Sequence, residues 1–161
     1  MYQMLPFHVK DTYSDNDDVY WRQILHAHRD FHGLPKYDWF IICDTEADTT
    51  QGIDCYKIGQ VCLFLEVIQN GERWHLAYVN WFLKRKRRDK EMGMCIVDWS
   101  HKYNIIGITA IVQSVHLQPL FEEQNSAIQA CSQNLDVYSF DAYVVNKYSD
   151  RASWEMFYWY H

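Results

Sequence analysis

The chain has 161 residues, enough for one domain with a sizeable core, and its 48% hydrophobic and 17% aromatic content indicates a folded, β-rich protein. The formal net charge of −6 argues against nucleic-acid binding by overall charge, because domains with that role usually carry a basic balance. No stretch is long and apolar enough to predict a transmembrane helix, and the first ten residues lack the pattern of a signal peptide.

Cysteine usage indicates a reducing compartment. Five cysteines occur, an odd number, and none of them forms a C-x-x-C pair. Cys43, Cys62 and Cys95 lie inside apolar, strand-like runs, where a free thiol behaves as a small hydrophobic side chain. We therefore expect a cytosolic or nuclear protein rather than a secreted disulfide framework.

The N-terminal region predicts an extended arm followed by a helix. Residues 1–14 look extended and exposed, and the polar run Ser14–Asp18 has the side chains that cap a helix N-terminus and suit its dipole. The spacing of one helix face then follows, at Trp21, Ile24, Leu25 and His28. Gly33 is a plausible left-handed C′ residue, and Pro35 prevents continuation. We therefore expect one N-terminal helix that closes at His32-Gly33.

The centre of the chain predicts a long hairpin. Residues 37–43 read as a strand and residues 44–54 as a polar surface loop, before the stretch KIGQVCLFLEVIQNGERWHLAYVNWFL at residues 57–83. Asn70-Gly71 between two runs of β-branched and aromatic residues is a strong hairpin signal. Alternation along the second strand puts Trp74, Leu76, Tyr78, Asn80 and Phe82 on one face, and His75, Ala77, Val79, Trp81 and Leu83 on the other. Both sets are largely apolar, which favours a barrel or a sandwich over a flat one-sided sheet.

The remaining segments predict further strands and a docked tail. They are a charged connection at 84–93, a short strand at 94–99, a buried strand at 104–112 continued past a bend at 115–121, a polar segment at 122–134, a last strand at 137–145, and an aromatic tail at 153–160. Pro119 is expected to end its strand or to place it at an edge of the sheet. Together these segments predict a single mainly β domain over residues 1–161. We expect a partly open antiparallel β-barrel with one N-terminal helix and a docked C-terminal aromatic tail.

Metal and catalytic motifs are weak. His28 and His32 would lie one helical turn apart, a spacing that can chelate zinc, but His26 would point about 200° away from His28 around the helix. No matching cysteine pair or H-E-x-x-H motif supplies further ligands. No nucleophile-elbow, phosphate-loop or dinucleotide-binding motif occurs, and no triad or carboxylate dyad has a suggestive spacing. We therefore expect no enzyme activity, no metal and no cofactor.

Two groups of residues suggest binding. The five cations Lys84, Arg85, Lys86, Arg87 and Arg88 match a nuclear-localisation or nucleic-acid patch, although a solvated loop between strands would look the same. The second group could build an aromatic cage for a methylated ammonium, with Asp98 as the nearby carboxylate, and comprises Tyr78, Trp81, Trp99, Tyr103 and Trp159. The alternative is that most of these rings belong to the core.

The central part of the chain resembles a bromo-adjacent homology (BAH) domain. The resemblance is carried by IGQVCLFLEV at 58–67, LAYVNWFLKRK at 76–86, CIVDWS at 95–100 and NIIGITAIVQSVHLQPL at 104–120. It implies a β-barrel module of chromatin proteins with a protein-interaction surface that reads histone tails in some members. Where such a domain has an aromatic cage, the resemblance implies that Trp81 forms one wall and that Trp99 lies where another can sit.

A second resemblance spans more of the chain. The segments 28–38, 116–121 and 140–150 resemble, in order and spacing, the C-terminal region of fungal transposon-encoded proteins of the Plavaka/KDZ type. The catalytic acidic residues of a transposase would lie in another part of such a protein, so this resemblance implies no catalytic residue here. The two resemblances are compatible, because such a C-terminal region can itself be BAH-like.

The sequence therefore predicts a non-catalytic, nuclear recognition module of a transposon-derived or chromatin-associated protein. Its expected partner is a protein or a histone-tail peptide, with Trp81 and Trp99 as anchors and Tyr78 and Asp98 beside them. One alternative is a nucleic-acid-binding appendage of a transposase-like protein that uses the basic segment 84–88 against DNA phosphates. The other alternative is a purely structural domain.

Overall fold

The structure, a computed structural model, describes residues 3–10, 20–45, 52–120, 138 and 140–149. Its strands are β1 (Met4–Lys10), β2 (Tyr20–Phe31), β3 (Leu34–Tyr37), β4 (Trp39–Cys43), β5 (Tyr56–Gln69), β6 (Glu72–Arg88), β7 (Cys95–Gly107), β8 (Ile111–Val115), β9 (Leu117–Pro119) and β10 (Ala142–Val145). Two 3₁₀ turns, η1 (Ile53–Cys55) and η2 (Ile108–Ala110), complete the described elements. The predicted mainly β, antiparallel fold is thereby confirmed. No described segment is a helix long and apolar enough to cross a membrane.

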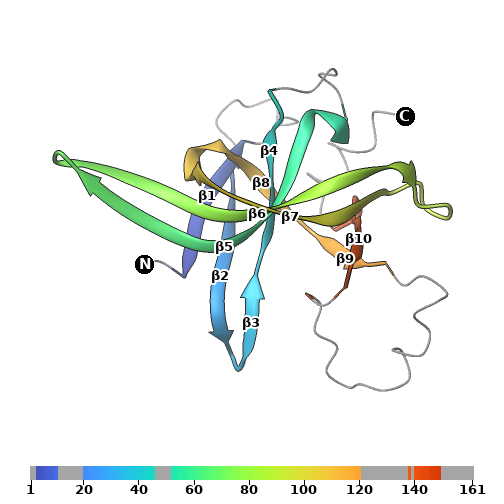
Figure 1. Cartoon of the computed structure of the whole chain (residues 1–161), viewed down its shortest axis with the longest axis horizontal. Helices are drawn as coiled ribbons and strands as arrows, with labels where there is room; N and C mark the ends of the chain where they lie inside the picture. Colours follow the sequence, from blue (N-terminus) through green and yellow to red (C-terminus); the bar gives the residue numbers. More distant parts are fainter. Residues whose placement is uncertain (1–2, 11–19, 46–51, 121–137, 139, 150–161) are drawn as a thin grey trace.

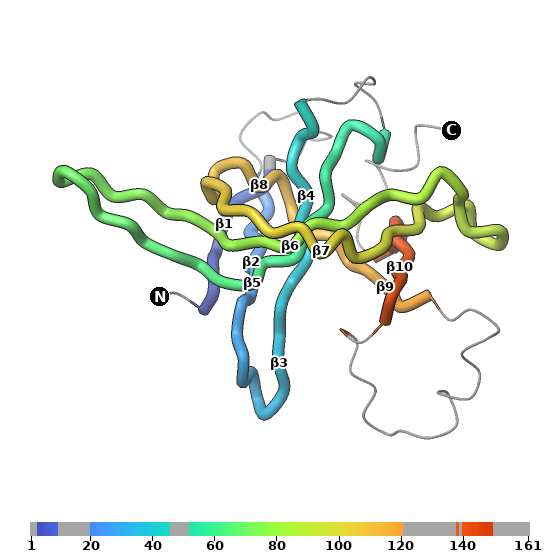
Figure 2. Tube along the Cα trace, viewed as in Figure 1, coloured from blue at the N-terminus to red at the C-terminus, as the bar shows by residue number. Residues whose placement is uncertain are grey.

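The strands form two antiparallel sheets. The N-terminal sheet has the order β1-β2-β3, and the main sheet has the order β8-β4-β5-β6-β7-β10-β9. Figure 1 shows the β5–β6 hairpin and the β6–β7 hairpin extending to opposite sides of the centre, with the β2–β3 hairpin projecting separately. The outermost strands of the main sheet, β8 and β9, are consecutive in the chain (Figure 2) but do not pair with each other. The described strands therefore form no closed barrel.

The predicted central hairpin is confirmed. β5 and β6 pair from Gly59↔Trp81 outward to Gln69↔Glu72, and Asn70 and Gly71 both have positive φ, at 54° and 82°. These two backbone conformations are what a primed two-residue turn requires, and asparagine and glycine adopt them at the lowest cost.

The predicted N-terminal helix is wrong. Residues 14–19 lie outside the described part of the chain, but Tyr20–Phe31 is strand β2, paired with β1 along most of its length. Leu25 and Ala27 alternate into the core, whereas Trp21 and Ile24 of the expected helix face are exposed. His32 and Gly33, expected to end a helix, instead form the β2–β3 turn with φ of 52° and 85°. A short run of apolar residues fits both the period of a helix and the period of a strand. Pairing with β1 decides in favour of the strand.

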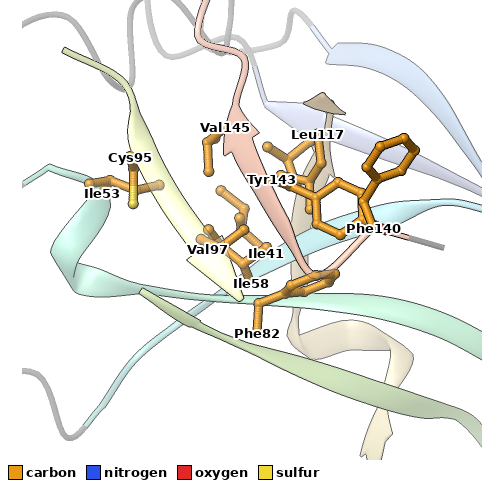
Figure 3. Packing of buried hydrophobic residues seen from close by; sticks show 11 residues of the cluster. Ile41, Ile53, Ile58, Phe82, Cys95, Val97, Leu117, Phe140, Tyr143 and Val145 are labelled. Carbon is orange, nitrogen blue, oxygen red and sulfur yellow. The ribbon is translucent and has the colours of Figure 1, made fainter. Parts of the chain in front are cut away.

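Each face of the main sheet carries a buried apolar cluster, in line with the apolar residues that the hairpin pattern placed on both faces. The Tyr143 cluster lies on one face (Figure 3) and comprises Ile41, Ile53, Ile58, Phe82, Cys95, Val97, Val115, Leu117, Phe140, Tyr143 and Val145. The Phe40 cluster lies on the other face and comprises Leu25, Ala27, Phe40, Val61, Phe64, Ala77, Val79 and Ile111. Leu25 and Ala27 come from β2, so the N-terminal sheet covers this second face.

Several boundaries differ from the expectation. The basic run 84–88, expected in a connection, belongs to β6, and β7 continues through what was predicted as two separate strands. Residues 4–10 of the expected arm are extended but pair with β2 as strand β1. Pro119 ends β9, as predicted. The expected polar segment at 122–134 and the aromatic tail at 153–160 lie outside the described residues.

Candidate functional site

Trp81, the first predicted anchor, packs into the core. Its ring lies 5.8 Å from the ring of Phe40, centroid to centroid, and it packs against the Phe40 cluster. Gly59, its partner across the β5–β6 ladder, makes this possible. A Cβ atom at Gly59 would lie 2.7 Å from Cζ of Phe40 and 3.1 Å from Cε3 of Trp81. The indole is therefore fitted closely between neighbouring core groups.

Trp99, the second predicted anchor, packs on the opposite face of the sheet. Its ring lies 4.3 Å from that of Phe82 and 5.9 Å from that of Tyr143, centroid to centroid, in the Tyr143 cluster. Its Nε1 donates a 2.9 Å hydrogen bond to the carbonyl oxygen of Phe140. Because Trp81 faces the other cluster, the sheet itself separates the two tryptophans, and they do not line one common pocket.

Asp98, the predicted cage carboxylate, is held by Arg85. The guanidinium donates from Nε to Oδ2 at 2.8 Å and from Nη2 to Oδ1 at 2.7 Å, a bidentate arrangement between β6 and β7. Both side chains are about one-third exposed. Both carboxylate oxygens of Asp98 therefore accept hydrogen bonds from Arg85, because bidentate guanidinium pairing engages the two of them.

The basic run is partly structural. Lys84 Nζ donates to the carbonyl oxygens of Ile53, Asp54 and Tyr56 at 3.2, 2.9 and 2.8 Å. Arg88 Nη2 lies 3.7 Å from a carboxylate oxygen of Asp54. Lys84, Arg85 and Arg88 thus have partners inside the fold. Lys86 and Arg87 are exposed and are the members best placed to meet a polyanion.

Replacing Lys84 with methionine should destabilise the protein, whereas the same replacement of Lys86 should not. Loss of the ammonium removes three charge-assisted hydrogen bonds that hold the η1 turn, for an expected loss of about 1–3 kcal/mol in the free energy of unfolding. Urea unfolding of Lys84→Met and Lys86→Met measures the difference. Equal stability of both variants would show that Lys84 makes no structural contribution.

An apolar stripe lies on one face of the hairpin region. It comprises Leu63, Leu65 and Val67 on β5, Trp74, Leu76 and Tyr78 on β6, and Tyr103 and Ile105 on β7, which the strand registers place together on that face. Trp74, Tyr103 and Ile105 are 51%, 52% and 53% exposed. The rings of Tyr78 and Tyr103 stack with centroids 5.5 Å apart and an interplanar angle of 14°. Contiguous exposure of this kind is typical of an interaction site.

The other face of the outer hairpin has a different composition. Glu66 and His75 pair across β5 and β6 on that face, as do Ile68 and Arg73. Arg73 Nη1 lies 3.2 Å from Oε1 of Glu66. Figure 1 shows this outer part extending away from the body of the molecule. The stripe is therefore an apolar patch without charged members, bordered by Glu72 at the hairpin tip, on a hairpin whose opposite face carries ionic side chains.

Sequence reasoning identified only part of the stripe. Tyr78 and Tyr103 were among the predicted cage aromatics, while Trp74 and Ile105 received no role. The available signal was the alternation along residues 74–82, which placed Trp74 and Tyr78 on the same face. The alternation does not indicate which face of the hairpin the N-terminal sheet covers.

Two cysteines and one histidine have structural surroundings. Burial raises the pKa of the Cys95 thiol to about 11 and also raises the pKa of Cys62, which leaves both as thiols at neutral pH. His26 Nδ1 lies 2.6 Å from Oδ2 of Asp38, a contact that links β2 to the β3–β4 junction. Within the described part of the chain, no three such side chains group as metal ligands.

Searches of protein-family models, curated proteins and solved structures found no match to this chain.

Proposed function

We propose that this chain is a non-catalytic protein-recognition module and that the apolar stripe is its docking surface. The observation that supports the proposal is the contiguous exposure of three aromatic rings beside aliphatic side chains, with no charged residue among the eight that form the stripe. Aromatic side chains supply large contact areas at low entropic cost and are enriched among the residues that dominate binding energy. The binding role therefore rests on Trp74, Tyr78 and Tyr103 rather than on the packed Trp81 and Trp99.

The BAH resemblance makes this proposal more specific. It implies a partly open barrel, nuclear placement, and a protein or histone-tail partner in a chromatin-associated or transposon-derived protein. The adjacency of β8 and β9 at the two ends of the main sheet is compatible with a curled, barrel-like sheet. The rival function is nucleic-acid binding through the exposed Lys86 and Arg87, which depends on charge and therefore on salt.

A titration distinguishes the two functions. The full chain is measured against unmodified and lysine-methylated histone-tail peptides, and against duplex and single-stranded DNA, at low and high salt. We expect peptide binding that persists at high salt and weakens at least tenfold in Tyr103→Ala. Tyr20→Ala is the matched control, since Tyr20 is equally exposed on β2, away from the stripe.

Two results would reject the docking role of the stripe. One is peptide binding that Tyr20→Ala weakens as much as Tyr103→Ala. The other is binding to DNA but not to peptide, with an affinity that falls steeply at high salt and is lost in Lys86→Met. The cations, and not the stripe, would then be the functional group.

A further inference from the structure

The apolar stripe has the composition of a self-complementary surface. None of its eight residues is charged, so it presents nothing that would select an acidic or a basic partner. In a two-fold symmetric interface the same patch meets itself, and like charges would face each other if the patch were charged. Copies of a chain with a net charge of −6 repel one another overall, and an uncharged apolar surface is where that repulsion is weakest.

The exposed area is close to what a dimer needs. The three aromatic rings of the stripe are between one-third and just over one-half exposed, and Val67 and Ile105 are also exposed. With the half-buried leucines, the stripe offers about 500–600 Å² per copy, if a large side chain carries roughly 150–250 Å² in all. A stable interface of standard size buries about 600–1,000 Å² per partner. Contacts at the rim of the stripe would supply the difference.

The geometry favours packing of faces over addition of a strand at the edge. The outer edge of β7 beside the stripe is obstructed at one amide, because the Ile105 N–H donates a 2.8 Å hydrogen bond to Oδ1 of Asn104. An added strand would have to displace this side chain to reach the amide. Two sheets packed face to face need only matching apolar surfaces, which lie about 10 Å apart in such an arrangement.

We infer that the partner of the stripe is a second copy of this chain, packed stripe to stripe in a symmetric dimer. This inference rests on the proposed function, because it names the partner of the same surface. The second copy and a histone-tail peptide would compete for the stripe, so peptide binding should weaken as the dimer forms. Sedimentation velocity of the full chain, over protein concentrations from about 1 to several hundred μM, should show a reversible monomer–dimer equilibrium.

One pair of variants tests the surface. Ile105 and Ile68 are both exposed, at 53% and 63%, and lie on opposite faces of the main sheet, Ile105 on β7 and Ile68 near the tip of the β5–β6 hairpin. Ile105→Lys places a charge in the stripe beside Tyr78 and should raise the dimer dissociation constant at least tenfold. Ile68→Lys should leave it unchanged. If Ile105→Lys fails to fold by circular dichroism, Tyr103→Ala tests the same surface and should also weaken the dimer at least tenfold.

The outcomes separate this inference from the proposed function. A monomer at every concentration overturns the second copy as the partner, as does equal weakening by the two lysine variants. A monomer that still binds a histone-tail peptide, sensitive to Tyr103→Ala, overturns the dimer but keeps the proposed docking role of the stripe. A monomer that binds no peptide overturns both.

Discussion

Trp81→Ala should lower the free energy of unfolding by about 2–4 kcal/mol. The side chain is half-buried in the Phe40 cluster, packs on the ring of Phe40 and fills the space that Gly59 leaves open. Removing the indole leaves a void beside Phe40 and Gly59, and the β5–β6 backbone cannot close it without disturbing its ladder. The variant should therefore melt at a lower temperature and unfold at a lower urea concentration.

Trp74→Ala is the control for this prediction. Trp74 lies on the same strand but is 51% exposed on the stripe, so its removal should change the free energy of unfolding by less than about 1 kcal/mol. The comparison decides between the two roles considered for Trp81. If Trp81→Ala kept normal stability but lost peptide binding, Trp81 would be the wall of a binding cage and not a core residue.

Trp99→Ala should destabilise the protein by a similar amount, about 2–4 kcal/mol, from the opposite face of the sheet. The indole packs on Phe82 and Tyr143, and its Nε1 hydrogen bond to the Phe140 carbonyl joins β7 to the segment that leads into β10. Loss of the ring removes the packing, and loss of the donor leaves the carbonyl without this partner.

Trp99→Phe separates these two contributions. It keeps an aromatic ring but removes the N–H donor, so it should cost about 1–2 kcal/mol, clearly less than Trp99→Ala. Urea unfolding of the two variants measures both values. Wild-type stability in Trp99→Ala would contradict the placement of this ring in the Tyr143 cluster.

The central hairpin could be predicted because its signals are local. Asn70-Gly71 specifies the turn chemically, and the alternating apolar residues on both sides specify strands. The prediction of a helix at β2 was wrong because the run of apolar residues was short and fitted the periods of both a helix and a strand. His32-Gly33 carried the same positive-φ signature as Asn70-Gly71, but it was interpreted as a helix end. Pairing of β2 with β1, a contact between distant parts of the sequence, decided the outcome.

The candidate site was harder to predict because it depends on which surfaces stay uncovered. The sequence shows that both faces of the hairpin are apolar, and it offers Tyr78 only as one of five aromatics that could form a cage. It did not show that β1 and β2 would cover the side of Trp81 and leave the side of Trp74 open. Likewise, the sequence alone indicates an exposed basic loop at residues 84–88. The structure shows instead that Lys84 donates hydrogen bonds to three backbone carbonyl groups.

Covalent footprinting of the aromatic side chains tests the central claim most directly. Hydroxyl radicals label accessible rings, and mass spectrometry reports the extent of labelling at each position. We predict strong labelling of Trp74 and Tyr103 in dilute protein, protection of both when a partner or a second copy is bound, and weak labelling of Trp81 and Trp99 throughout. Labelling of Trp81 or Trp99 as strong as that of Trp74, with protection by the partner confined to them, would contradict the account.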